Sequence, residues 1–83
     1  MPTEIVAPQR PLTFGEKAVG LSFNPSGSTV VNTIKVLYAA VIDELDQARN
    51  IAASSEAKRQ YSVAITEAQT SQMWAVKAAT WKD

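Results

Sequence analysis

The segment STVVNTIKVLYAAVIDELDQARN, residues 28–50, is the main indicator of the fold class of this chain. Apolar side chains recur along it at spacings of three and four residues, which is the period of one face of an α-helix. The members of this stripe are Val31, Ile34, Tyr38, Val41, Leu45 and Ala48, and Val30, Leu37 and Ile42 lie beside it. The stripe is wide enough to meet more than one neighbour. The pattern therefore predicts a helix from about Ser28 to about Asn50 that packs against more than one other element.

A second long helix is predicted from about Glu56 to about Trp81. Ser54 or Ser55 supplies its N-cap, and Glu56 in the first turn suits the helix dipole. Its stripe is rich in alanine and consists of Tyr61, Ile65, Ala68, Gln72, Ala75 and Ala79. Because the linker between the two long helices is short, we expect them to be antiparallel neighbours.

The N-terminal part of the chain has a different character. Residues 1–12, MPTEIVAPQRPL, contain three of the four prolines and show no periodicity, so they are predicted to be an extended arm. Thr13 and Glu16 form a capping-box pattern, and Gly20 ends the short helix that follows. The predicted fold class is all-α, an antiparallel helical hairpin with a short N-terminal helix, in one domain over residues 13–83.

Composition excludes several classes of function. The 83 residues include no cysteine and no histidine, which removes thiolate catalysis, histidine bases and the usual zinc sites. No clustered carboxylates or nucleophile–base pair are apparent, so neither an enzyme nor a cofactor or metal is expected. A formal net charge of zero argues against binding of long DNA or RNA. With no leader pattern or spanning apolar run, we expect a soluble cytoplasmic protein without a membrane partner.

A hairpin of two helices cannot enclose all of its apolar surface. Several large apolar side chains lie away from the predicted seam, and they indicate a second buried surface. These residues are Val63, Met73, Trp74, Val76 and Trp81. We therefore predict that the chain forms a homo-oligomer, with the two tryptophans more typical of core or interface anchors than of nucleotide platforms.

The segment FNPSGS, residues 23–28, precedes the first long helix and has two interpretations. The start of the helix presents free N–H groups, so a phosphate could sit there with help from Asn24, Ser26 or Ser28, and Phe23 could stack on a base. The simpler interpretation is a capped turn in which Phe23 is a hydrophobic staple. These six residues alone favour the cap, because capping is far commoner than ligand binding.

Other polar residues are also open to two interpretations. Lys35, about two turns into the helix, either reaches an anion held near the helix start or is simply an exposed lysine. Arg59 either grips a phosphate or pairs with a nearby carboxylate. Polar side chains also interrupt the alanine seam and need hydrogen-bond partners, either across a subunit interface or around a ligand. They are Thr66, Gln69, Thr70 and Gln72.

A family resemblance sharpens this picture. LSFNPSG leading into VNTIKVLYAAVIDEL, followed by SVAITEAQTSQMWAVKAATW, resembles the small phage-encoded anti-CBASS sponge proteins of the anti-CBASS protein 2 family over about residues 13–82. The resemblance implies a compact hexamer in the cytoplasm of the infected bacterium. It also implies that the hexamer sequesters cyclic dinucleotides such as 3′,3′-cGAMP between pairs of protomers, and cyclic trinucleotides in separate pockets near the three-fold axes, without cleaving them.

The resemblance also assigns roles to residues. Phe23 matches the aromatic residue of the dinucleotide pocket and Lys35 its phosphate-facing lysine, whereas Asn24 and Arg59 match contacts of the trinucleotide pocket. The predicted ligand-binding set is completed by Pro25, Ser26, Gly27 and Thr66. Two alternatives stay open: a small structural or adaptor protein of a phage that docks through its tryptophans, and a sponge for signals of the cyclic ADP-ribose type.

Overall fold

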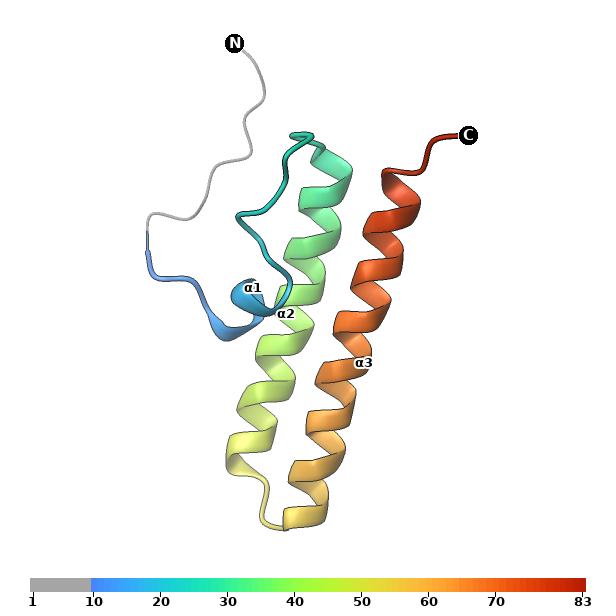
Figure 1. Cartoon of the computed structure of the whole chain (residues 1–83). Helices are drawn as coiled ribbons and strands as arrows, with labels where there is room; N and C mark the ends of the chain where they lie inside the picture. The colour runs from blue at the N-terminus through green and yellow to red at the C-terminus, as the bar shows by residue number, and fades with distance from the viewer. Residues whose placement is uncertain (1–9) are drawn as a thin grey trace.

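The computed structural model describes residues 10–83, so residues 1–9 of the arm predicted over residues 1–12 lie outside the described part. Three helices, α1 (Phe14–Ala18), α2 (Thr29–Ile51) and α3 (Ser55–Ala79), make up its secondary structure, and no strand occurs among residues 10–83. The two long helices lie side by side and antiparallel, α1 packs against α2, and the loop after α1 returns along α2 toward the start of that helix (Figure 1). The predicted all-α hairpin with a short N-terminal helix is confirmed.

Serine hydroxyls fix the starts of both long helices. The Ser28 Oγ accepts a hydrogen bond from the Val31 N–H at 3.2 Å, and the Ser54 Oγ accepts one from the Ala57 N–H at 3.0 Å. Each bond satisfies one of the free N–H groups of a first helical turn. Of the two serines proposed as caps of α3, Ser54 is therefore the cap, and α3 ends at Ala79, two residues before the predicted Trp81.

The hydrophobic core lies between α1, the loop after it and the two long helices. Its buried apolar members are Val19, Leu21, Val31, Ala39, Ile42 and Ile65. On α2 the buried residues also include Lys35, whereas Val41 of the predicted stripe is exposed. The prediction was wrong at Val41 because α1 and its loop cover the side of α2 that carries Lys35 and Ala39, which hydrophobic periodicity does not mark.

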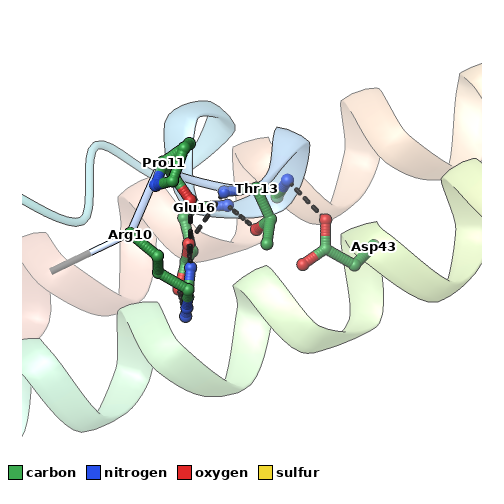
Figure 2. Close-up of polar contacts among 6 residues, drawn as sticks. Arg10, Pro11, Thr13, Glu16 and Asp43 are labelled. Atoms are coloured by element: carbon green, nitrogen blue, oxygen red, sulfur yellow. Dashed lines mark hydrogen bonds and ion pairs between the residues drawn. The ribbon is translucent and has the colours of Figure 1, made fainter. Parts of the chain in front are cut away.

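A glycine allows α1 to lie directly on α2. A Cβ atom added to Gly15 would sit 2.2 Å from the carbonyl oxygen of Ala39, so no side chain fits at this position. The Gly15 N–H donates to Oδ1 of Asp43 at 2.7 Å. This hydrogen bond satisfies a free N–H group in the first turn of α1 and links that helix to the middle of α2 (Figure 2).

The predicted capping box at the start of α1 is confirmed, and it has an additional partner. The Thr13 Oγ1 accepts from the Glu16 N–H at 3.1 Å, and Glu16 Oε1 accepts from the Thr13 N–H at 2.8 Å. Arg10 donates to both carboxylate oxygens of Glu16, at 2.7 and 2.8 Å (Figure 2). The Arg10 guanidinium and the Thr13 N–H together lower the pKa of Glu16 to about 2. The last residues of the predicted arm are thus bound to the domain, since Leu12 also packs against the core.

Candidate ligand-binding site

Lys35 is the central polar residue of the candidate site. Its side chain is only 7% exposed, and its Nζ donates hydrogen bonds to the backbone oxygens of Gly20, at 2.9 Å, and Phe23. Burial away from water lowers the pKa of this ammonium group. The interpretation of Lys35 as an ordinary exposed lysine is therefore wrong. The side chain fastens the loop after α1 to α2.

The loop that Lys35 holds is also organised from within. Gly20 has φ of +64° and Gly27 has φ of +65°, a conformation that glycine adopts without strain. The Asn24 Nδ2 donates to the Ser28 backbone oxygen at 2.8 Å, and the Gly27 N–H donates to the Asn24 backbone oxygen at 3.0 Å. With Ser28 capping α2, the capping interpretation of FNPSGS is confirmed as the local structure of this segment.

Phe23 projects from this loop with its ring largely free. The side chain is 62% exposed, and the Lys35 Nζ lies 5.7 Å from the centroid of the ring. The ammonium group is therefore within the range of a cation–π contact. The hydrophobic-staple interpretation of Phe23 is not supported, because a staple residue packs its ring against the helix that it precedes. The arrangement instead offers a flat aromatic surface next to a positive charge.

A hollow of about 500 Å³ opens beside these two side chains. It brings together five of the predicted ligand-binding residues: Phe23, Asn24, Pro25 and Ser26 from the loop, and Lys35 from α2. Val31, Val76 and Thr80 complete its wall, and sequence reasoning missed them. The wall forms because the loop returns along α2 toward the end of α3 (Figure 1). In the sequence, the only residue that indicated a turn at the start of this path was Gly20.

A second hollow of about 430 Å³ shares Phe23, Lys35 and Val76 with the first. It extends along the loop past Gly20 to Gln72 on α3. Phe23 and Lys35 therefore stand between two neighbouring concave surfaces. Gln72, one of the polar residues that interrupt the predicted alanine seam, is buried here rather than exposed.

Arg59 and Thr66 lie elsewhere on the molecule. Arg59 pairs with a nearby carboxylate, because it donates to Glu56 at 2.7 to 2.9 Å, and this bond raises the pKa of Arg59. Thr66 is exposed midway along α3. Asn24 lies at the start of α2 and Arg59 follows its end, and a helix of 23 residues spans about 35 Å. One chain does not bring the predicted trinucleotide contacts together.

The part of the chain from residue 10 onward contains neither a metal cluster nor a helix that could span a membrane. No group of three or more acidic side chains there is arranged to hold a metal ion. None of the helices described combines the length and the apolar character needed to cross a bilayer. The Phe23–Lys35 surface combines an exposed aromatic ring with a positive charge, and this chemistry suits a ligand with a flat apolar part and a negative charge.

The fold and this surface together define a small helical-hairpin protein with an exposed aromatic ring beside a buried lysine, on the turn before its first long helix. The family model described as Acb2/Tad1, hairpin domain, matches residues 16–80. The chain therefore belongs to this family, which is the anti-CBASS protein 2 family. Comparison with curated proteins and with solved structures gave no match. Membership confirms the resemblance noted in the sequence and implies, in broad terms, a phage anti-CBASS role as a sponge for cyclic oligonucleotides rather than as an enzyme.

Proposed function

We propose that this protein sequesters cyclic dinucleotides and cyclic trinucleotides, and thereby blocks CBASS signalling in the cytoplasm of a bacterium infected by a phage. A sponge acts by mass action, because each messenger that it binds is withheld from its effector. The observation that carries the proposal is the exposed Phe23 ring beside the buried Lys35 ammonium, on a hairpin that matches the family model over residues 16–80.

The chemistry of the first hollow suits a cyclic dinucleotide. The Phe23 ring offers a face on which a base can stack, a contact worth about 1 to 3 kcal/mol. A lysine ammonium carries three donors, and Lys35 uses two of them on backbone oxygens, which leaves one for a phosphate oxygen. Because Lys35 and the loop are fixed before the ligand arrives, little conformational entropy is lost on binding.

We propose that the protein forms a homo-oligomer. The family resemblance implies that this oligomer is a hexamer. Val30, Leu37 and Val41 are each more than half exposed and recur on α2 at helical spacing, so they form an uncovered apolar face. The proposed trinucleotide pocket needs this assembly, because Asn24 and Arg59 lie near opposite ends of α2 and can meet only between copies.

The first experiment asks what the purified protein retains. The protein is incubated with a panel of cyclic di- and trinucleotides that also includes cyclic ADP-ribose-type signals, freed of unbound ligand and denatured. The released compounds are then identified by mass spectrometry. Intact cyclic oligonucleotides support the proposal, and chemically altered ones contradict it. Light scattering on the same sample gives the oligomeric state.

Arg59 tests the trinucleotide part of the proposal separately. Arg59→Ala is expected to weaken binding of cyclic trinucleotides in calorimetry while leaving dinucleotide affinity unchanged. Lys58→Ala, which removes the neighbouring exposed charge, is the matched control. If Arg59→Ala binds trinucleotides as tightly as the wild type, the trinucleotide pocket has been placed wrongly.

One feature favours the adaptor function as a second candidate. Trp74 on α3 and Trp81 just after its end are each 65% exposed, and the Lys77 Nζ lies 4.9 Å from the centroid of a Trp74 ring. An exposed aromatic patch of this kind is typical of a protein interface. A correctly assembled oligomer that retains no nucleotide from the panel would make the adaptor function the better account.

A further inference from the structure

The second hollow contains a buried polar side chain that the fold does not use. Gln72 is 5% exposed, and its amide makes no hydrogen bond to any of residues 10–83. Within that range, every side-chain nitrogen or oxygen that is wholly buried has a hydrogen-bond partner. The Gln72 amide has none, so its atoms must keep the small exposed surface of this residue, and Gln72 lines the hollow. The amide is therefore open to water in the hollow, and a ligand that fills the hollow must replace that water as its hydrogen-bond partner or leave the amide unsatisfied.

Its neighbour Gln69 shows what a structural glutamine does in the same place. One turn earlier on α3, the Gln69 Nε2 donates to the Ala18 backbone oxygen at 3.4 Å and so links α3 to α1. Gln72 makes no such link. Instead it shares its hollow with the Phe23 ring, the Lys35 ammonium and the apolar side chains of Met73 and Val76.

These neighbours match the parts of a nucleotide. A base stacked on Phe23, with its phosphate toward Lys35, can place its hydrogen-bonding edge at Gln72. A primary amide presents a donor and an acceptor side by side, and this pair is complementary to the adjacent acceptor and donor on the edge of a nucleobase. We propose that Gln72 reads the edge of the base that stacks on Phe23, and thereby determines which cyclic nucleotides bind. This inference rests on the proposed function.

Two variants test this role. Gln72→Leu has a similar volume but removes both hydrogen-bonding groups, and it is expected to lower affinity for cyclic dinucleotides at least tenfold in calorimetry. Gln72→Glu replaces the amide donor with a second acceptor. At pH 8 it is expected to shift the ratio of affinities at least tenfold, away from cyclic di-adenylate and toward cyclic di-guanylate, whose bases offer two adjacent donors. Gln47→Leu, at an exposed position on α2, is the matched control.

Thermal unfolding separates base reading from a structural role. Because the amide of Gln72 has no partner to lose, Gln72→Leu is expected to unfold at a temperature no lower than that of the wild type. An unfolded Gln72→Leu protein would show that the amide is structural and would overturn the inference.

The binding outcomes separate this inference from the proposed function. If the wild type binds cyclic dinucleotides and Gln72→Leu loses less than tenfold in affinity, or if Gln72→Glu leaves the affinity ratio unchanged, the inference alone is overturned. If the wild type binds none of the panel, the proposed function fails and the inference fails with it.

Discussion

Replacing Lys35 with methionine tests whether one buried ammonium group organises the loop that forms the proposed site. Methionine keeps an unbranched apolar stem but removes the donors to the Gly20 and Phe23 backbone oxygens. A hydrogen bond to a charged group contributes about 1.5 to 3 kcal/mol to stability. Part of this loss of stability is offset, because the variant no longer buries a charged group. We expect the free energy of unfolding to fall by about 2 kcal/mol.

In a domain of this size, 1 kcal/mol corresponds to about 4–8 °C in the melting temperature, so Lys35→Met should unfold about 8–16 °C below the wild type in circular dichroism. Both proteins must be measured at one concentration, because the proposed assembly would make the melting temperature depend on concentration. Lys58→Met is the matched control, since Lys58 also donates to a backbone oxygen, that of Arg49 at 3.1 Å, but is exposed. Equal melting temperatures for Lys35→Met and Lys58→Met would show that the buried Lys35 ammonium does not hold the loop in place.

Three further substitutions probe the ring, the helix contact and the cap. Phe23→Ala removes a stacking contact worth about 1–3 kcal/mol, so it should weaken cyclic dinucleotide binding about 5- to 150-fold in calorimetry. The ring is largely exposed, so the melting temperature should stay unchanged, and a large loss of stability would show that the ring is structural. Gly15→Ala should lower the melting temperature by about 4–24 °C, since its Cβ would meet the Ala39 oxygen at 2.2 Å, and an unchanged value would contradict this close approach. The Glu16 pKa is lowered to about 2 in the folded state, so its charged form stabilises the fold above pH 4.5, and this stabilisation is lost as pH falls from 4.5 to 2. Glu16→Gln should therefore show a smaller fall in melting temperature across that window, and an equal fall would count against this role.

Local rules were enough to predict the secondary structure. The spacing of apolar residues located both long helices to within one or two residues of their ends, and the Thr13–Glu16 pattern predicted the capping box that the structure contains. Each of these signals depends on neighbouring residues in one helix or turn. These signals can therefore be recognised in the sequence without knowledge of the tertiary contacts.

The candidate site depended on contacts that no local rule contains. Lys35 is polar, so hydrophobic periodicity places it on the exposed side of its helix, yet the loop after α1 supplies two carbonyl oxygens that make its burial favourable. The path of that loop depends on the contact between Gly15 and Ala39, 24 positions along the chain. FNPSGS was read correctly as a cap, but only the folded loop shows that the same segment also leaves Phe23 free.

The proposed ligand chemistry itself indicates that one protomer is not enough. Stacking on Phe23 contributes about 1–3 kcal/mol and one charge-assisted hydrogen bond from Lys35 about 1.5–3 kcal/mol, at most about 6 kcal/mol together. Nanomolar binding, which a sponge needs in order to compete with an effector, corresponds to about 12 kcal/mol. A cyclic dinucleotide has two bases and two phosphates, so two symmetry-related copies of this surface around one ligand supply twice the contacts. Oligomerisation is therefore part of the proposed binding mechanism, and it explains how a chain with no net charge can bind a dianion.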